Sequence, residues 1–321
     1  MCIQGYDVIG DVHGMADMLE KLLSEMGYAM SGGAWHHPTR KAIFVGDLVD
    51  RGLGQLRTYR LVRAMVEAGS ALVVMGNHEL NAIAFHMDDG KGGHYRQRSE
   101  KNYNQHRGFI EEVGLDTALH AELIEWFLTI PVFLDLDGIC VIHACWDEPS
   151  IVALSGHLDE QNRLRRDRIA DVFQGTANAW QADGTRKPMN PAFHAMETLV
   201  KGIEVELPEG LSYADADGHV RTATRIAWWQ GAGATYRSAG IIPSPLQTRL
   251  PDIAIPAVAA PGYEGKKPLF IGHYWMQGKP TPLTPKVACV DYSVAKKGEM
   301  VSYRWSGETE LRSDHFHVVK P

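Results

Sequence analysis

Three short turns of similar chemistry constrain the fold of this 321-residue chain more than any other feature. Each turn combines glycine with acidic or amide side chains and with histidine or arginine: residues 10–14 (GDVHG), 46–52 (GDLVDRG) and 76–79 (GNHE). An apolar run rich in β-branched or aromatic residues directly precedes each turn. The pattern therefore predicts three buried strands that end where the turns begin.

Apolar residues at helical spacing lie between these predicted strands. Leu19, Leu22 and Leu23 belong to the first such stripe, and Tyr59 and Val62 belong to the second. Strands that alternate with helices favour parallel βαβ units, and in open α/β sheets ligands bind beyond the carboxyl ends of the strands. All three turns should therefore meet at one edge of a sheet.

The side chains of these turns suit a pair of divalent cations. Two neighbouring cations need anionic oxygens that bridge them and neutral nitrogen donors that complete their coordination. Two later histidines, each after an apolar run, add to the set. The candidate metal ligands are Asp11, His13, Asp47, Asn77, His143 and His273. Each has a plain alternative: the carboxylates and the amide could cap helices, and the two isolated histidines could be hydrogen-bonded structural residues.

Three further polar residues of the turns suit phosphate chemistry. Arg51 carries the planar donor fork that pairs with phosphate oxygens, and Asp50 is placed to orient His78. A surface salt bridge for Arg51 and a solvated turn position for Asp50 are the alternatives. Together the turns predict a two-metal centre that acts on phosphate groups.

The ordered set resembles the phosphoprotein phosphatase branch of the calcineurin-like metallophosphoesterases. The signature of that branch is GDxHG, GDxxDRG and GNHE in series, followed by two isolated histidines, and every element is present between Asp11 and His273. Residues 6–11 and the stretch before Gly46 are also similar to a bacterial group. That group includes the symmetric and asymmetric diadenosine tetraphosphatases and the phosphatase half of polynucleotide kinase-phosphatases.

The resemblance implies a role for each matched residue. The implied metal ligands are Asp11 and His13 for one ion, Asp47 as the bridge, and Asn77, His143 and His273 for the other ion. It also implies that a hydroxide bridging the metals attacks phosphorus in line, while His78, held by Asp50, protonates the leaving oxygen and Arg51 binds the phosphoryl group. We expect two divalent ions, with manganese as the first choice and iron, zinc or nickel as alternatives.

Two downstream residues match the family by position. The family brings a second arginine to the phosphate from between the last two histidines, and Arg225 is the candidate here, with cross-strand pairing as the alternative. Some bacterial relatives place an aspartate after the last histidine. Asp291 corresponds to it, which implies a role in supporting the metal ligands from behind.

The resemblance implies a metal-dependent phosphatase that acts on monoesters of proteins or small molecules. A first alternative is a dinucleoside polyphosphate hydrolase of the bis(5'-nucleosyl)-tetraphosphatase type. Asp50 argues mildly against the symmetric members of that type, which tend to lose this aspartate. A second alternative is a catalytically idle metal-binding scaffold, which would be expected to lose Asp50, His78 or Arg51, and all three are present.

The remaining motifs are incomplete. Residues 78–82 lack the second histidine of a zinc-protease helix, and residues 231–236 lack the third glycine of a dinucleotide-binding loop. Residues 213–218 lack the first carboxylate of a calcium loop and are expected to form a hairpin turn. No GxxxxGK[ST] loop occurs in the sequence, so a P-loop kinase domain is absent from this chain.

The composition, with 45% hydrophobic and 22% charged residues, fits a folded enzyme. A net charge of −7 disfavours a general nucleic-acid surface. The basic residues of 163–168 are expected on the solvated face of a helix, with recognition of a phosphate-rich substrate as the alternative. Four cysteines without a CxxC pair, no secretory leader and no run of 18 apolar residues lead us to expect a cytoplasmic protein that binds no membrane. The resemblance implies that its partners are phosphorylated substrates.

The fold implied by the resemblance is α/β, with a central β-sandwich of mixed sheets flanked by helices in four αββα layers. We expect one domain over residues 1–321, with a polar and helical insertion at about 81–130 that overhangs the metals. A proline-rich loop is expected at about 243–268, and strands from Val205 onward are expected to complete the sandwich.

Overall fold

The computed structural model describes residues 4–174, 179–180, 186–187, 190–214, 220–242 and 246–321. Cys2, the tip of the expected hairpin within 215–219 and the first three residues of the expected proline-rich loop lie outside the described residues.

The first sheet forms where the sequence predicts it. β1 (Gly5–Ile9) pairs in parallel with β4 (Arg40–Phe44), and β4 pairs in parallel with β5 (Ala71–Val73). α1 (Ala16–Glu25) and α2 (Gln55–Glu67) follow the first two of these strands and bury the apolar stripes seen in the sequence. The expected βαβαβ unit is confirmed, and the three turns leave the same edge of the sheet.

The end of the chain completes this sheet with antiparallel strands. β18 (Glu299–Trp305) pairs with β1, and β17 (Asp291–Tyr292) and β19 (Phe316–Val319) both pair with β18. The sheet order is β17-β18-β1-β4-β5, so parallel and antiparallel pairs occur in one sheet. A short hairpin of β2 (Ala29–Ser31) and β3 (Ala34–His36) lies between α1 and β4.

The second sheet has the order β16-β15-β7-β6. β15 (Leu269–Ile271) pairs in parallel with β16 (Val287–Cys289) and β7 (Cys140–Ile142), whereas β6 (Phe133–Asp135) pairs antiparallel with β7. Its inner face packs against the first sheet through fully buried side chains, among them Val8, Ile43, Val141, Phe270 and Tyr303.

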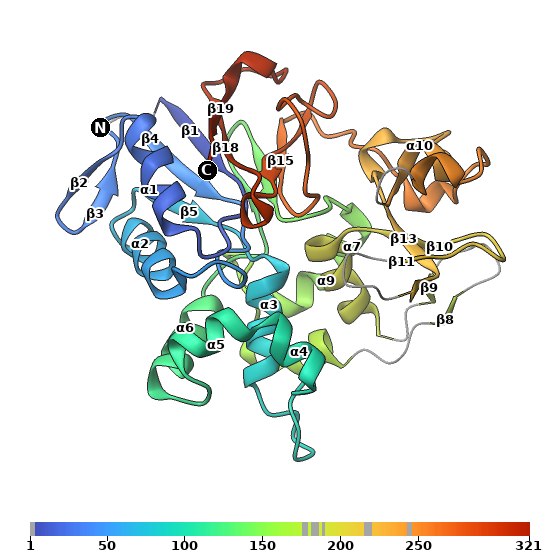
Figure 1. The fold of residues 1–321 in the computed structure, drawn as a ribbon, viewed down its shortest axis with the longest axis horizontal. Coiled ribbons are helices and arrows are strands. Elements are labelled where there is room, and N and C mark those ends of the chain that lie inside the picture. The colour runs from blue at the N-terminus through green and yellow to red at the C-terminus, as the bar shows by residue number, and fades with distance from the viewer. Residues whose placement is uncertain (1–3, 175–178, 181–185, 188–189, 215–219, 243–245) are drawn as a thin grey trace.

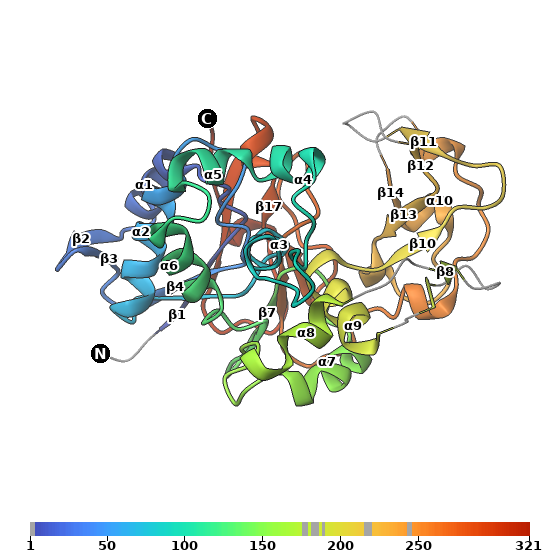
Figure 2. The ribbon, with the colours of Figure 1, turned by 90° about the horizontal axis from the view of Figure 1, so that it is seen from below.

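Helices flank the sandwich on both sides (Figures 1 and 2). α1 and α2 lie against the first sheet, and α7 (Glu148–Leu154) and α9 (Pro191–Lys201) lie beside the second. The backbone carbonyl of Leu199 in α9 accepts hydrogen bonds from the residues that follow His143. The predicted α/β fold with a sandwich of mixed sheets between helices is confirmed.

Four helices follow the GNHE turn. α3 (Asn77–His86) begins within that turn, and α4 (Glu100–Gln105), α5 (Arg107–Val113) and α6 (Ala118–Phe127) come after a loop. Figure 1 shows them together on one side of the sandwich. No helix among the described residues has the length and apolar character needed to span a bilayer.

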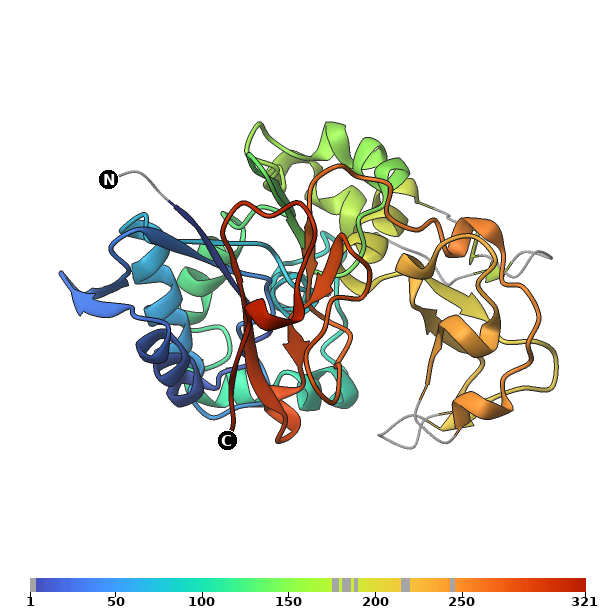
Figure 3. The ribbon, with the colours of Figure 1, turned by 90° about the horizontal axis from the view of Figure 1, so that it is seen from above.

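The expectation that strands after Val205 complete the sandwich holds only in part: β15 to β19 belong to its two sheets, whereas the strands between Val205 and residue 242 do not. β10 (Glu204–Glu206), β13 (Ala223–Ile226) and β14 (Gly240–Ile241) form a separate three-stranded sheet, seen beyond the sandwich in Figures 1 and 3. In β10 and β13 buried residues alternate with half-buried ones, whereas the strands of the second sheet around β15 are buried on both faces. Strands with one apolar face suit a sheet that covers the core from outside.

Two local expectations near these strands have different outcomes. β11 (Tyr213–Ala214) and β12 (Val220–Arg221) pair antiparallel, which supports the expected hairpin. The basic cluster at 163–168 does not lie on an α-helix, since only a 3-10 turn covers Arg166–Arg168. Its arginines pair with acids, for example Arg163 with Asp159, and recognition of a phosphate-rich substrate by this cluster stays an untested alternative.

One buried carboxylate joins several elements of the first sheet. Asp7 in β1 is fully buried and accepts hydrogen bonds from Arg40 Nε at 2.9 Å, Arg304 Nε at 2.9 Å and the Tyr28 hydroxyl at 3.0 Å. These donors come from β4, β18 and the residue before the β2–β3 hairpin. Asp7 is therefore the shared counterion of Arg40 and Arg304, and without it both guanidinium charges would lose their partner.

We predict that Asp7→Ala lowers the free energy of unfolding by about 3–5 kcal/mol, the usual effect of removing one partner from a buried ion pair. Urea denaturation followed by circular dichroism measures it. Asp314→Ala is the matched control, because Asp314 pairs with Arg312 at the exposed surface and its loss should change little. Equal effects in the two variants would contradict the prediction.

Candidate active site

The three turns and two later strand ends converge at the carboxyl edges of the two sheets. β1, β4 and β5 lead to Asp11, Asp47 and Asn77, while β7 and β15 lead to His143 and His273. Since neighbouring parallel strands end at the same edge, residues far apart in sequence meet there. The structure brings together all six predicted metal ligands.

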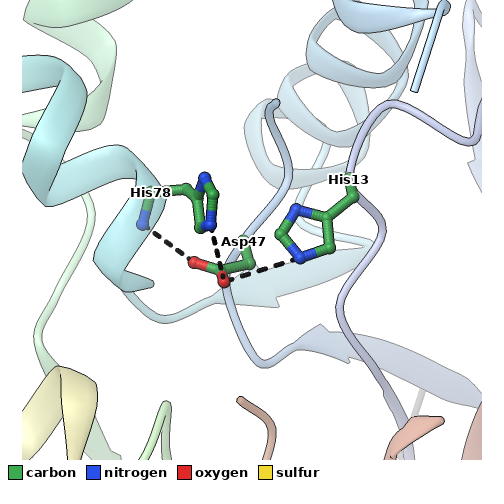
Figure 4. A group of neighbouring side chains, drawn as sticks. All are labelled: His13, Asp47 and His78. Atoms are coloured by element: carbon green, nitrogen blue, oxygen red, sulfur yellow. Dashed lines mark hydrogen bonds and ion pairs between the residues drawn. The ribbon is translucent and has the colours of Figure 1, made fainter. Parts of the chain in front are cut away.

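Asp47 lies at the centre of the cluster (Figure 4). One of its carboxylate oxygens is 3.7 Å from His13 Nε2 and 3.8 Å from His78 Nε2. The other accepts a hydrogen bond from the backbone N–H of His78 at 2.9 Å and is 3.4 Å from His143 Nε2. Imidazole nitrogens from different turns therefore lie near both oxygens of Asp47, an arrangement that suits the bridging role expected from the sequence.

The other predicted ligands surround Asp47. His143 Nε2 is 3.2 Å from Asn77 Oδ1, and the imidazole rings of His143 and His273 have centroids 5.1 Å apart. The backbone N–H of His273 lies 3.2 and 3.3 Å from the two carboxylate oxygens of Asp11. The side chains of Asp11 and His273 therefore belong to the same cluster.

The histidine nitrogens are arranged to accept a cation. His13 Nδ1 donates to the Val49 carbonyl at 2.9 Å and His143 Nδ1 donates to the Val45 carbonyl at 2.7 Å, so in the neutral rings Nε2 carries the lone pair. His13 Nε2 and His273 Nε2 are buried and have no hydrogen-bond partner among the described residues. Buried polar atoms without partners are rare and require an explanation such as a bound ion.

The electrostatics of the cluster also favour positive charge. Burial and then the charge of Asp291 raise the pKa of Asp11 well above its ordinary value. Burial alone would lower the pKa of His143, but the Asp47 carboxylate raises it to about 10. Burial and the neighbouring His78 lower the pKa of His13 to about 3, which keeps this ring in the neutral, ligating form. Divalent cations would offset the buried negative charge, so the residues present fit such ions.

Backbone strain is concentrated at this cluster. Ten non-glycine residues of the described chain have positive φ, and six of them lie in the turns around the site: His13, Asp47, Asp50, Arg51, His273 and Trp275. Such conformations cost of order 1–3 kcal/mol each and persist where the surrounding structure enforces them. Their concentration here indicates that side-chain direction is maintained at the expense of stability.

Two glycines allow the turns to approach one another closely. A Cβ atom on Gly76 would lie 2.3 Å from the backbone nitrogen of Asp47, and one on Gly272 would lie 2.2 Å from Asp11 Oδ1. Neither space can hold a side chain. The glycines therefore set how near the GNHE turn lies to Asp47 and how near His273 lies to Asp11.

Asp50 and His78 form the expected pair. Asp50 is buried, and its Oδ2 accepts from His78 Nδ1 at 2.5 Å. Burial opposes the charged form of His78, but Asp47 and then Asp50 outweigh it and raise the pKa of His78. Asp50 is therefore not a solvated turn residue.

Two residues in contact with the site were not assigned roles from the sequence. Glu79 is fully buried and accepts from the backbone N–H groups of Gly76, Asp47 and Leu48 at 2.8–3.0 Å, which fastens the second turn to the third. His106 is buried and its Nδ1 bonds Asp50 Oδ1 at 2.6 Å. The acidic first turn of α3 was a signal for Glu79, whereas nothing local to His106 indicates its partner.

A cavity of about 170 Å³ opens onto the cluster. Seven of the predicted site residues line it, namely Asp47, Asp50, Arg51, Asn77, His78, Arg225 and His273. The other four, Asp11, His13, His143 and Asp291, are buried and are not among the lining residues. The carboxylate of Asp291 accepts from the backbone N–H groups of Trp275 and Ser293 at 2.7 and 2.9 Å. Asp291 thus supports the loop that follows His273.

Both predicted phosphate-binding arginines reach this cavity. The guanidinium of Arg51 lies 5.4 Å from the ring centroid of Trp275 and has no acidic partner among the described residues. Arg225 comes from β13, and its Nε is buried without a partner in the described part of the chain. Burial lowers the pKa of His273 well below its ordinary value, and the charge of Arg225 lowers it further. Arg51 and the Nε of Arg225 are therefore available to an anion, while Arg225 lies opposite Glu204 in the β10–β13 ladder.

The opposite wall of the cavity comes from the stretch after the GNHE turn. Its polar lining residues there are Asn81, Arg96, Asn102, Gln105 and His106, and Lys201 of α9 and Trp275 complete the rim. The 81–130 stretch therefore contributes directly to the walls of the site.

The sandwich of mixed sheets and the aspartate and histidine cluster at its edge define the class of metallophosphoesterases. The chain belongs to the calcineurin-like phosphoesterase family, whose family model matches residues 6–221. The enzyme class expected from the sequence, a hydrolase of phosphate esters, is confirmed by this match.

Similar proteins include two asymmetrical bis(5'-nucleosyl)-tetraphosphatases named PrpE. The one from Halalkalibacterium halodurans is 46% identical over 74 residues, which cover 23% of this chain and 30% of the relative. The one from Oceanobacillus iheyensis is 32% identical over 139 residues, which cover 43% of this chain and 54% of the relative. The chain thus spans about half or less of the length of these relatives. A solved cold-active protein-tyrosine phosphatase from a Shewanella species is 17% identical with a TM-score of 0.49, covering 99% of this chain and 81% of that chain.

We predict that metal-stripped protein becomes more stable when Mn²⁺ is added, because a cation offsets the repulsion among buried carboxylates. Binding to the folded chain alone should add about 2.7 kcal/mol at a hundredfold excess over Kd. Differential scanning fluorimetry measures the rise in Tm, and the Asp47→Asn variant, which loses the central charge, should show a smaller rise. An unchanged Tm with each of Mn²⁺, Fe²⁺, Zn²⁺ and Ni²⁺ would contradict the metal centre.

Proposed function

We propose that this protein is a dinuclear metal-dependent phosphatase that hydrolyses phosphate monoesters. The observation that carries the proposal is the position of Asp47 between imidazole groups, with His13 Nε2 on one oxygen and His143 Nε2 on the other. In this proposal Asp11 and His13 hold one ion, Asp47 bridges, and the remaining ligands hold the second ion: Asn77, His143 and His273.

The residues around the ions have complementary roles in this scheme. When bound, two divalent ions supply an activated water nucleophile and neutralise phosphoryl oxygens. Arg51 and Arg225 bind the phosphoryl group with guanidinium donors that have no acidic partner in the described chain. His78, which lines the cavity and is fixed through Nδ1 by Asp50, gives a proton from Nε2 to the leaving oxygen.

Support for these roles comes from the direction of each group. His78 Nε2 points to the same Asp47 oxygen as His13 Nε2, so the proposed proton donor faces the proposed metal position. Asp291 binds backbone groups beside His273 and acts by holding that loop. Manganese is the first ion to test, because a mixed oxygen and nitrogen ligand set also accepts iron, zinc and nickel.

The test is phosphate release by metal-stripped protein with and without Mn²⁺, using p-nitrophenyl phosphate and an alkyl phosphate. Asp47→Ala should lose both metals and turnover, since only a bridging ligand touches both ions. His78→Ala should keep both metals and lose about 10² to 10⁴ in rate on the alkyl phosphate, the usual contribution of a general acid. Two metals retained in Asp47→Ala, or an unchanged alkyl phosphate rate in His78→Ala, would refute the corresponding role.

A second candidate function is hydrolysis of dinucleoside polyphosphates. The specific observation is the charge of the cavity wall, which is lined by Arg51, Arg96, Arg225 and by Lys201, the last of which pairs with Glu197, against the carboxylates of Asp47 and Asp50. One phosphoryl group needs fewer cations than this when metals are also bound. The PrpE relatives carry the name of such an activity, which adds support.

Arg96 is the cation best placed for a second phosphate. Its guanidinium donates to Asn81 Oδ1 at 3.2 Å and to Gln105 Oε1 at 2.7 Å, both neutral acceptors. Burial lowers the pKa of Arg96, with only distant Glu197 and Asp50 opposing it. A partly buried cation held by amides and lining the cavity is available to an additional anionic group.

We predict that Arg96→Gln raises KM for a dinucleoside tetraphosphate about 10- to 100-fold more than KM for p-nitrophenyl phosphate, as expected for a lost charged hydrogen bond. Arg98→Gln is the matched control, because Arg98 lies two residues away, binds Asp116 through both amino groups and is not among the cavity-lining residues. Steady-state kinetics on both substrates measure the ratio. An equal rise in KM on both substrates would contradict a second phosphate site at Arg96 and favour phosphate monoesters as the only substrates.

A further inference from the structure

We propose that His106 is a positioning residue for His78 that acts through Asp50, so that the stretch after the GNHE turn completes the catalytic apparatus. The inference rests on the proposed role of His78 as proton donor. It concerns a residue that none of the sequence motifs contains.

The Asp50 carboxylate is divided between two histidines. Its Oδ2 accepts from His78 Nδ1 at 2.5 Å, and its Oδ1 accepts from His106 Nδ1 at 2.6 Å. The backbone N–H of Asp50 donates to Gln55 Oε1 at 2.8 Å, which fixes the main chain behind the carboxylate. Rotation of the carboxylate would break both imidazole bonds, so each histidine holds the orientation that the other one uses.

Without His106, Asp50 Oδ1 would have no side-chain donor among the described residues. Asp50 is 3% exposed, so this oxygen would be left buried and unpaired or would draw in water. An unpaired oxygen favours rotation of the carboxylate away from His78, and a water would hold Oδ1 without the fixed direction that the His106 ring provides. Burial alone would raise the pKa of Asp50. The charge and hydrogen bond of His106, and then the hydrogen bond of His78, outweigh burial, so the pKa of Asp50 lies below its ordinary value.

Packing alone does not explain an imidazole at this position. The ring stacks on Phe109 with centroids 4.6 Å apart and meets the edge of Phe85 at 5.6 Å. An apolar side chain would fill such a space without the cost of a buried nitrogen. His106 Nε2 is buried and has no partner in the described chain, so only Nδ1 offsets the burial of the ring, through Asp50.

The fold explains how a residue so far from the motif reaches Asp50. His106 ends α4 and precedes α5, where its N–H bonds the Tyr103 carbonyl at 3.0 Å and its carbonyl accepts from Ile110 at 3.1 Å. Two short helices therefore hold its backbone from both sides. The His106 side chain reaches Asp50, and His106 lines the same cavity as His78.

The experiment compares His106→Leu, His106→Asn and a control in zinc- or manganese-loaded protein. In His106→Leu, kcat for an alkyl phosphate should fall about 10- to 100-fold, the usual cost of losing a residue that orients another, with little change in KM. The loss should be smaller on p-nitrophenyl phosphate, whose leaving group needs little protonation. His106→Asn should recover most of the rate, because its amide nitrogen takes the place of Nδ1.

His120→Leu is the matched control. His120 is 1% exposed, lies in the same stretch and contacts Phe109 at 5.7 Å, but it is not among the cavity-lining residues. It should change thermal stability without altering the ratio of rates on the two substrates. Equal losses on both substrates in His106→Leu, with no rescue by His106→Asn, would overturn the proposal and leave His106 a structural residue.

A spectroscopic readout separates this proposal from the proposed function. In the zinc-loaded protein, the low-field proton resonance of His78 Nδ1–H bonded to Asp50 should persist in His106→Asn and be lost or shifted in His106→Leu. A resonance unmoved in His106→Leu overturns the positioning role. If wild-type protein with two metals turns over neither substrate, the proposed function fails, and this resonance still decides whether His106 orients His78.

Discussion

The Asp47 carboxylate is the interaction on which the arrangement of the site depends, because it lies where the two sheets and the three turns meet. His13, His78 and His143 come from three different parts of the chain and all direct Nε2 to this group. The backbone behind it is fastened by Glu79, which also holds the GNHE turn. This cluster can form only if the strands of both sheets end at the same place. The sandwich therefore positions Asp47 and the side chains around it.

Concentrating this much negative charge and strain in a core has a cost that the rest of the structure must offset. Buried carboxylates without cations and residues with positive φ both destabilise the folded chain. The interior between the two sheets, with fully buried residues such as Phe270 and Tyr303, supplies the opposing hydrophobic stabilisation. A rigid site is thus obtained because the strained turns are anchored at the ends of well-packed strands.

The sequence predicted what depends on local pattern. The first three strands, their helices and the convergence of His143 and His273 with the turns followed from apolar runs that end in polar turns. The β2–β3 hairpin was not predicted although Gly32 and Gly33, both with positive φ, mark its turn, because its three-residue strands are too short to show an apolar period. The sheet of β10, β13 and β14 was misplaced because alternating patterns show that a strand has one buried face and do not show which sheet it joins.

His106 and Arg96 show where such prediction ends. Their partners, Asp50 and Asn81, lie 56 and 15 residues away, and the contacts depend on how α3, α4 and α5 pack. No repeating pattern in the sequence predicts how these helices pack against one another. The end of the cavity around Asp47 is therefore formed by motifs shared across a family, whereas the wall with Arg96 and His106 depends on tertiary contacts that no motif contains. Under the proposed function, selection among phosphate substrates should depend mainly on that second wall, because the proposed metal ligands would meet every phosphoryl group in the same way.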